Sequence, residues 1–196
     1  MDNSHKIILD LCGGTGGWSR PYERAGYKVI IVDPSIENGM FGDNSIYGNF
    51  DVRLLQKPHY EVHGILCAPP CTVFASSGAR WKRSDADMVN GLSVVDACLR
   101  IVWACKPKWW ALENPVGKLV RYLGKPKLYF QPCDYGDPYT KKTCLWGEFN
   151  EPKKTPVVPT LGSRIHTQYG GKSANTKRAR SKTPVGFANA FFEANP

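Results

Sequence analysis

A chain of 196 residues is long enough for one compact α/β domain and too short for two full domains. With 42% apolar residues and no low-complexity tract, the chain has the composition of a protein with a packed core, which excludes disorder for most of its length. The formal charge is +9, but residues 1–105 hold 10 basic and 11 acidic side chains whereas residues 106–196 hold 16 and 6, a regional excess that predicts a polyanionic partner.

The N-terminal segment predicts a βαβ unit. Residues 7–11 form an apolar run typical of a buried strand, and a glycine loop at 13–17 follows directly. A short helix with Ser19 as its N-cap is expected next, and residues 27–32 form a second apolar strand. Strand, loop, helix and strand in this order favour a right-handed crossover in a parallel sheet. The predicted fold class is therefore α/β, doubly wound and Rossmann-like, with a mostly parallel sheet.

Further elements continue this alternation along the chain. Residues 84–105 carry apolar side chains at helical spacing, and Ser84 with Asp87 has the pattern of a capping box. The remaining predicted elements are strands at 62–66 and 109–112, an extended or loop-like region at 148–182 and a closing helix at 185–194.

The cysteines and the apolar segments indicate the cellular compartment. Seven cysteines, an odd number without a Cys-x-x-Cys pair, predict reduced thiols and neither a disulfide framework nor a zinc site. The most apolar stretch, 92–105, is interrupted by Asp96 and Arg100, and the first six residues lack an apolar signal region. We therefore expect a protein of the cytoplasm, in a bacterium or a virus-infected host, with no membrane partner.

The glycine loop has the features of a nucleoside-binding turn. Asp10 precedes glycines that let the backbone approach a ligand, and Asp33 ends the next strand, where it can accept both ribose hydroxyls. A dinucleotide fingerprint fits less well, because the third glycine of the G-x-G-x-x-G pattern falls on Ser19. A site for S-adenosyl methionine, which has no pyrophosphate, suits the spacing better. A glycine turn with only a structural role is the alternative.

Two further strand ends carry reactive groups. Two prolines restrict the backbone just before Cys71 and hold its thiol out of the core, at the sheet edge where doubly wound folds bind ligands. Glu113 and Asn114 close the next predicted strand, so a thiol and an acid are expected to face one substrate. A buried, inert thiol is the alternative for Cys71 and the expectation for Cys67.

Taken in chain order, these motifs resemble those of the cytosine carbon-5 DNA methyltransferases. The resemblance spans residues 7–192, and the order of its parts is more specific than any single motif. Its parts are the loop Asp10-Leu-Cys-Gly-Gly-Thr-Gly-Gly, the acidic positions Asp33 and Asp51-Val52, the nucleophile motif Pro70-Cys71, the Glu113-Asn114 pair, the segment Asp134-Tyr-Gly-Asp-Pro-Tyr-Thr-Lys-Lys-Thr and the final segment Gly186-Phe-Ala-Asn189-Ala.

The resemblance implies S-adenosyl methionine as the cofactor, no metal, and nucleic acid, in particular DNA, as the partner. The implied catalytic residues are Cys71, Glu113, Asn114 and Lys141. The implied cofactor-binding residues are Asp10, Leu11, Cys12, Gly13, Gly14, Thr15, Gly16, Gly17, Trp18, Asp33, Pro34, Asp51, Val52, Pro69 and Asn189. Nucleic-acid contacts are expected from Arg80, Trp81, Lys82, Arg83, Lys142, Lys177, Arg178 and Arg180, with a solvated charged surface as the alternative.

Several side chains depart from the family pattern. Thr72 and Pro115 stand where the family has Gln and Val, a change that alters loop geometry more than chemistry. The family's two arginines align with Lys141 and Thr143. The cation that contacts the cytosine oxygen is therefore missing at Thr143 unless Lys141 or Lys142 supplies it.

The region before the closing helix is short for the family. Only 34 residues, 148–181, stand where the family usually has a sizeable target-recognition domain. We expect a single catalytic domain over 1–196, in which 148–182 is a short basic loop region with little capacity to read a sequence.

The resemblance implies methyl transfer to carbon 5 of cytosine in DNA through a covalent cysteine adduct. Cys71 thiolate adds to carbon 6, Glu113 supports protonation at ring nitrogen 3, and carbon 5 then takes the methyl group. Two alternatives stay open: the same chemistry on a cytidine nucleotide, a single-stranded nucleic acid or tRNA, and a non-catalytic methyltransferase-like binding protein. A protein subunit that supplies specificity is a further candidate partner.

Overall fold

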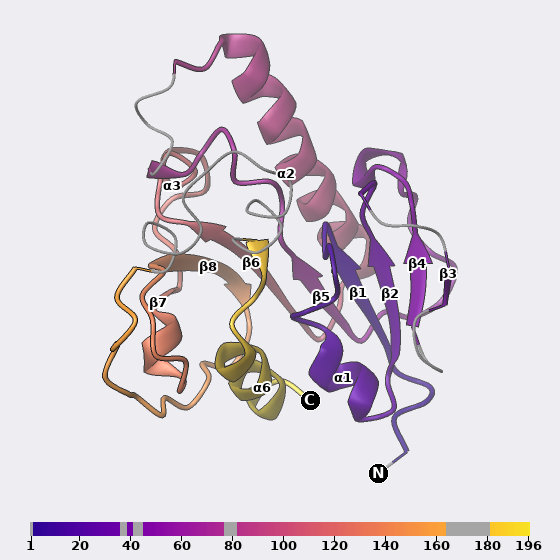
Figure 1. The fold of residues 1–196 in the computed structure, drawn as a ribbon. Helices are drawn as coiled ribbons and strands as arrows, with labels where there is room; N and C mark the ends of the chain where they lie inside the picture. Colours follow the sequence, from indigo (N-terminus) through magenta and orange to yellow (C-terminus); the bar gives the residue numbers. More distant parts are fainter. Residues whose placement is uncertain (1, 36–38, 41–44, 77–81, 164–180) are drawn as a thin grey trace.

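An eight-stranded sheet forms the centre of the molecule (Figure 1). The computed structural model describes residues 2–35, 39–40, 45–76, 82–163 and 181–196. The strand order across the sheet is β3-β4-β2-β1-β5-β6-β8-β7. The strands are β1 (Ile7–Leu11), β2 (Lys28–Val32), β3 (Gly39–Met40), β4 (Ser45–Gly48), β5 (Gly64–Cys67), β6 (Trp109–Pro115), β7 (Leu128–Phe130) and β8 (Thr143–Glu148).

The strands from β4 through β2, β1 and β5 to β6 run parallel. β3 pairs antiparallel with β4, and β8 pairs antiparallel with both β6 and β7. The predicted α/β class and mostly parallel sheet are confirmed, and β1, α1 and β2 form the predicted βαβ unit. The strands β3, β4, β7 and β8 add to the predicted elements. β7 has three residues, too few to give a periodic pattern.

Helices cover both faces of the sheet (Figure 1). α1 and α6 pack into the apolar cluster on one face, and α2 and α3 pack into a separate cluster on the other. The helices are α1 (Arg20–Arg24), α2 (Asp85–Cys105), α3 (Val120–Leu123) and α6 (Val185–Ala194), with short 3₁₀ turns η1 (Val52–Leu54) and η3 (Pro132–Asp134).

An aromatic cluster holds α6 against the sheet. The Phe187 ring stacks on Phe130 of β7 with 3.8 Å between ring centroids, and Phe191 meets the Trp18 ring edge-on at 5.4 Å. Because aromatic rings bury large apolar areas, these contacts fix the last helix beside the segment that follows β1. The predicted closing helix at 185–194 is confirmed.

The two predicted helix starts have different outcomes. α2 begins with the predicted capping box: Asp87 N–H donates to the Ser84 hydroxyl at 3.1 Å, and Ser84 N–H donates to the Asp87 carboxylate at 3.0 Å. Ser19 is the N-cap residue of α1, as predicted, but it makes no side-chain cap, because its hydroxyl donates to the buried Asp10 carboxyl at 2.6 Å. The first turn of α1 does not need a side-chain cap, because the N–H groups of Arg20, Tyr22 and Glu23 donate to the backbone carbonyls of Gly16 and Ser19.

α2 has the length and composition of a membrane-spanning helix despite Asp96 and Arg100. The same properties are found in core helices of water-soluble proteins. Val95, Cys98 and Ile101 of α2 are fully buried in the apolar cluster beneath the sheet. The inner face of α2 is therefore occupied by the protein's own core.

Candidate active site

Three neighbouring strands, β2, β1 and β5, end side by side at one edge of the sheet, and β6 continues past them to Pro115. Val32 of β2 pairs with Leu11 of β1, Leu11 pairs with Cys67 of β5, and Cys67 pairs with Leu112 of β6. The residues that follow these positions are Asp33, the glycine loop, the segment Pro69-Pro70-Cys71 and the Glu113-Asn114 pair. The carboxyl edge of the parallel strands thus brings together the predicted cofactor and nucleophile motifs, at the place where such sheets bind ligands.

The glycine loop after β1 packs directly on the Asp10 carboxyl. A side-chain carbon on Gly13 would lie 2.4 Å from Asp10 Cγ, which only glycine avoids. Gly14 has a φ of 55°, and its N–H donates to Asp33 Oδ2 at 3.0 Å. Gly13 and Gly14 therefore shape a turn whose backbone is open to a ligand and anchored to the end of β2.

Asp10 supports the loop from beneath and lies inside the protein. Its side chain is fully buried, and burial raises its pKa to about 7 although the Ser19 hydrogen bond opposes this rise. Among the described residues, Asp10 Oδ1 is one of few buried side-chain oxygens without a hydrogen-bond partner. Leu11 and Trp18 are also buried in the apolar clusters. Their side chains are part of the core, which is not the environment expected of side chains that contact a cofactor.

Asp33 is held in a fixed orientation at the end of β2. Its Oδ1 accepts hydrogen bonds from the Ser35 N–H at 2.9 Å and from the Ser35 hydroxyl at 2.5 Å. Its Oδ2 accepts the Gly14 N–H described above. Each oxygen keeps further acceptor capacity, as ribose hydroxyls would require.

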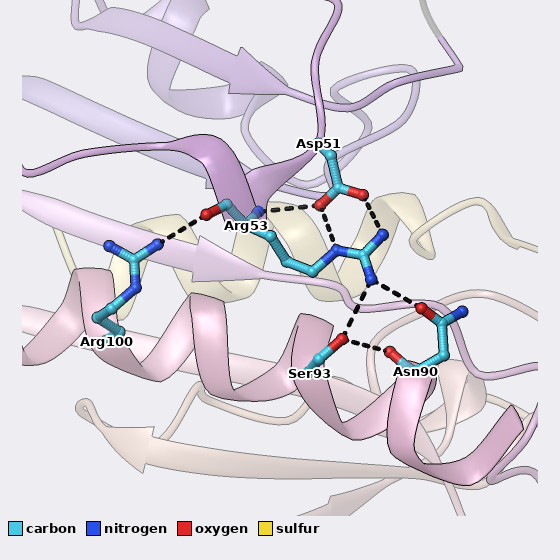
Figure 2. A network of polar contacts seen from close by, with 5 residues as sticks. All are labelled: Asp51, Arg53, Asn90, Ser93 and Arg100. Carbon is cyan, nitrogen blue, oxygen red and sulfur yellow. Dashed lines mark hydrogen bonds and ion pairs between the residues drawn. The ribbon is translucent and has the colours of Figure 1, made fainter. Parts of the chain in front are cut away.

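Asp51 precedes η1 and belongs to a polar network that connects η1 to α2 (Figure 2). The Arg53 guanidinium donates to both Asp51 oxygens and, from its other edge, to Asn90 Oδ1 at 2.7 Å and the Ser93 hydroxyl at 3.2 Å. The Arg100 guanidinium donates to the Arg53 carbonyl at 3.3 Å (Figure 2). The predicted cofactor residue Asp51 is thus held by Arg53, two residues along the chain. The contacts of Arg53 with Asn90 and Ser93 carry no sequence signal, because α2 is far away in the chain.

The nucleophile loop after β5 is tied to β6 from within the protein. Asn114 is fully buried, and its Nδ2 donates to the Pro69 carbonyl at 2.9 Å. The half-buried Cys71 follows, and its carbonyl accepts the N–H groups of Phe74 at 3.0 Å and Ala75 at 2.9 Å. This turn fixes the backbone that carries the Cys71 thiol.

Glu113 lies within β6 beside a lysine. Lys141 Nζ is 4.0 Å from Glu113 Oε1, and both side chains are largely buried. Burial raises the pKa of Glu113, and the Lys141 charge opposes this rise. A carboxyl group with a raised pKa is suited to donate a proton near neutral pH.

The structure distinguishes between the lysines that could replace the second family arginine. Thr143 is buried, and its hydroxyl donates to the Lys141 carbonyl at 2.8 Å. Lys142 Nζ lies 5.4 Å from the Tyr129 ring centroid. Lys141 is therefore the lysine at Glu113, and the Lys142 ammonium lies beside Tyr129 of β7.

The C-terminal segment reaches the glycine loop through a residue that the motif did not identify. A side-chain carbon on Gly17 would lie 3.8 Å from the Thr183 backbone nitrogen. Asn189, the predicted residue, lies exposed in the middle of α6. The available signal was the Thr183-Pro184 pair just before the helix start, since the residues preceding a helix are free to contact a neighbouring loop.

The predicted nucleic-acid residues are described only in part. Arg83 Nη2 donates to the Thr72 carbonyl at 3.0 Å, directly after Cys71, and Lys82 is exposed. Arg80, Trp81, Lys177, Arg178 and Arg180 lie outside the described residues.

The remaining thiols near the site are structural. Cys67 is fully buried, and its thiol is hydrogen-bonded to that of Cys98. A hydrogen bond to Cys98 and burial raise the pKa of the neighbouring Cys12 far above its ordinary value. All seven cysteines are described, and none forms a disulfide.

Comparisons with known proteins bear on the fold and on the class of chemistry. No protein-family model matches the chain. The chain is 24% identical over 213 residues to the type II methyltransferase M.DdeI of Desulfomicrobium norvegicum. That alignment covers 91% of this chain and 48% of M.DdeI, so the chain spans about half the length of this curated relative.

A solved structure resembles the chain over most of its length. It is assigned to a DNA modification methyltransferase encoded within a prophage of E. coli, with a TM-score of 0.56 and 19% identity. The match covers 86% of this chain and 56% of the other. The likeness and the strand order together show that the chain adopts the Rossmann-like α/β fold of methyltransferases.

Proposed function

We propose that this protein is an S-adenosyl methionine-dependent methyltransferase that acts on carbon 5 of cytosine in DNA. The observation that carries the proposal is the register of β1, β5 and β6: β1 and β5 end at Leu11 and Cys67, level with Leu112 of β6, so the glycine loop, Cys71 and Glu113 lie at one edge. The similarity to M.DdeI, a type II methyltransferase, supports methyl transfer as the class of chemistry, and the likeness to the prophage methyltransferase supports the fold.

The residues around the glycine loop fit a methionine-linked nucleoside. The bare backbone at Gly13 and Gly14 leaves room for a close approach, and Asp33 presents acceptors for two ribose hydroxyls. The buried Asp10 carboxyl lies beneath this turn and supports its backbone. When bound, S-adenosyl methionine supplies an electrophilic methyl group, which carbon 5 of cytosine accepts only after the ring is activated.

The chain's own residues supply that activation. The Cys71 thiolate forms a bond to carbon 6, and Glu113 gives its proton to ring nitrogen 3, which leaves carbon 5 electron-rich. After carbon 5 is methylated, a base removes its proton, the bond between sulfur and carbon 6 breaks, and Cys71 leaves as a thiolate. Ring nitrogen 3 returns its proton to Glu113. Asn114 positions the Cys71 segment through the Pro69 carbonyl.

Lys141 takes the position of the family's first arginine. Because Lys141 lies 4.0 Å from Glu113, it is the cation nearest the acid among the described residues. We place it where it limits the rise in the Glu113 pKa and faces the polar edge of the base. Thr143, turned toward the Lys141 carbonyl, does not serve this purpose.

Transfer of a labelled methyl group tests the proposal. The protein is incubated with tritiated S-adenosyl methionine and cytosine-containing duplex DNA, and the product nucleosides are separated. We expect the label in 5-methylcytosine, and we expect a covalent complex with 5-fluorocytosine DNA, in which the carbon 5 substituent cannot be removed. Cys71→Ala should abolish both signals, whereas Cys105→Ala, which alters a half-buried thiol at the end of α2, should retain them.

Other substrates separate the alternatives. Single-stranded DNA, tRNA and cytidine triphosphate are assayed side by side with the duplex. Label in N4-methylcytosine or in an adenine product would contradict carbon 5 chemistry. Labelled 5-methylcytosine found in tRNA alone would support the carbon 5 chemistry and would show that the substrate is tRNA and not DNA.

A further inference from the structure

The segment between β6 and β7 is joined to the loop that carries Cys71. Ala75 and Gly117 form an antiparallel bridge, and the Lys118 N–H donates to the Phe74 carbonyl at 2.8 Å. A side-chain carbon on Gly117 would lie 1.9 Å from that same carbonyl, so only glycine permits the approach. α3 therefore lies next to the nucleophile loop at the carboxyl edge of the sheet (Figure 1).

This segment is basic and exposed. Residues 114–133 contain four basic side chains and no acidic one, and all four are exposed. Lys118 and Arg121 flank the buried Leu119, which anchors α3 in the core. Lys127 is engaged elsewhere, because its ammonium group donates to the Phe149 carbonyl. Lys118, Arg121 and Lys125 remain, and of these Lys118 and Arg121 are nearest in the chain to Gly117, which bridges to the nucleophile loop.

Two tyrosines accompany these cations. Tyr122 of α3 is 51% exposed and Tyr129 of β7 is 39% exposed. The Lys142 ammonium lies 5.4 Å from the Tyr129 ring centroid, and the Lys142 carbonyl accepts the Val116 N–H at 3.3 Å. Exposed aromatic rings among cations are the combination that binds nucleic-acid strands, through base stacking and phosphate contacts.

We propose that the exposed side chains of Lys118, Arg121, Tyr122, Tyr129 and Lys142 form a DNA-binding surface, which we call the α3 surface. The three cations contact phosphates, and the tyrosines offer ring faces to bases that are unstacked next to the target. This inference rests on the proposed function for its partner, since it places the DNA beside Cys71. The surface uses charge and stacking, so it binds DNA with little regard to sequence.

Salt-dependent binding tests the α3 surface directly. The affinity of the full chain for a labelled duplex is measured by fluorescence anisotropy between 50 and 200 mM salt. Each phosphate contact contributes about 0.9 to the slope of log K against log salt concentration. The triple variant Lys118→Gln, Arg121→Gln, Lys142→Gln should therefore lower the slope by roughly 2 to 3. Arg24→Gln removes an exposed arginine from the last turn of α1 and should leave the slope unchanged.

Single-stranded DNA tests the aromatic part. Tyr122→Ala should weaken binding at least about fivefold, whereas Tyr122→Phe keeps the ring and should bind like the unmodified chain. An unchanged slope in the triple variant, or no DNA binding by the unmodified chain, would overturn the α3 surface. If the protein binds tRNA and does not measurably bind DNA, the proposal that the α3 surface binds DNA is wrong. Methyl transfer is assayed separately, so DNA binding through these residues without transfer would contradict the proposed function alone.

Discussion

The loop after β1 and the loop after β5 leave adjacent strands at the same edge, but they are fixed by opposite means. The cofactor loop is built from glycines, and its backbone is held by carboxylates: Gly13 packs on Asp10, and Gly14 donates to Asp33. The nucleophile loop is built on prolines, and Asn114 holds it through the Pro69 carbonyl. A loop that a ligand must approach closely has glycines, which carry no side chain. A loop that must orient one thiol has prolines, which restrict its backbone.

Each loop contacts one buried polar side chain, Asp10 for the cofactor loop and Asn114 for the nucleophile loop, and these two side chains differ in whether they can ionise. Asp10 and Asn114 are both fully buried, and each has one oxygen without a hydrogen-bond partner among the described residues. Asp10 can ionise and Asn114 cannot. The cofactor loop should therefore respond to pH through its support, whereas the nucleophile loop should respond through Glu113.

After the complete loss expected for Cys71→Ala, the largest expected effect is also on the nucleophile side, at Glu113. Glu113→Gln should lower the rate of methyl transfer about 10²- to 10⁴-fold, because an amide cannot give a proton to ring nitrogen 3. Single-turnover rates on duplex DNA measure the loss, and the melting temperature reports whether the variant is folded. A rate within threefold of the unmodified protein would remove Glu113 from the mechanism.

The pH profile sharpens the role of the neighbouring lysine. Glu113 acts in its protonated form, so activity should decline as pH rises through its raised pKa. Lys141→Met removes the positive charge that opposes the rise in the Glu113 pKa. The descending limb of the plot of activity against pH should therefore move to higher pH. Lys141→Arg keeps the charge and should leave the limb in place. A limb that stays fixed in Lys141→Met would exclude this coupling.

Asn114 should give the next largest effect, on both stability and turnover. Asn114→Ala leaves the buried Pro69 carbonyl without its donor, and this costs about 1–3 kcal/mol of the free energy of unfolding. Urea denaturation measures that loss. Asn189→Ala, at an exposed position of α6, is the matched control and should change the free energy by less than about 0.5 kcal/mol. Equal stability of the two variants would show that the Asn114 contact does not hold the loop.

Asp10 tests the ionisable support of the cofactor loop. The folded-state pKa of about 7 lies above the ordinary value of 3.8, so the native protein binds more protons than the unfolded chain between these values. The stabilising contribution is complete below pH 3.8 and is lost as pH rises toward 7. Asp10→Asn does not titrate, so its stability relative to the unmodified protein should increase from pH 4 to pH 7. A constant difference across this range would contradict the raised pKa.

Arg53 should give the smallest effect. The Arg53 contact with Asp51 is well exposed to solvent, so Arg53→Gln should cost at most about 1 kcal/mol of stability. If Asp51 contacts the cofactor, loss of the guanidinium should weaken S-adenosyl methionine binding severalfold in isothermal titration calorimetry. Arg100→Gln breaks contacts to the η1 backbone and leaves the Asp51 carboxylate paired, so it is the control. If Arg53→Gln binds S-adenosyl methionine as tightly as the unmodified protein does, the contact from Arg53 does not contribute to cofactor binding by Asp51.

Local patterns in the sequence determined the central part of the fold. The apolar runs of β1 and β2, the capping box of α2 and the closing helix all carry signals within a few neighbouring residues. The strands β7 and β8 do not, because three residues give no period and because antiparallel pairing with β6 is a long-range choice. Ser19 shows the same limit: its neighbours suggest a cap, but its hydroxyl bonds to Asp10.

The sequence by itself predicted that the candidate groups follow or close successive parallel strands; they follow β1, β2 and β5, whereas Glu113 and Asn114 lie inside β6, which continues to Pro115. Only the tertiary structure decided which of two adjacent lysines lies at Glu113, that Thr183 reaches the glycine loop, and that Asn90 and Ser93 of α2 contact the Arg53 guanidinium. For the lysines, the physical reason is that neighbouring residues of an extended chain point in opposite directions, and for the other contacts it is that the partners are far apart in the sequence. Which direction faces the site depends on how distant segments pack, and a motif records no information about that packing.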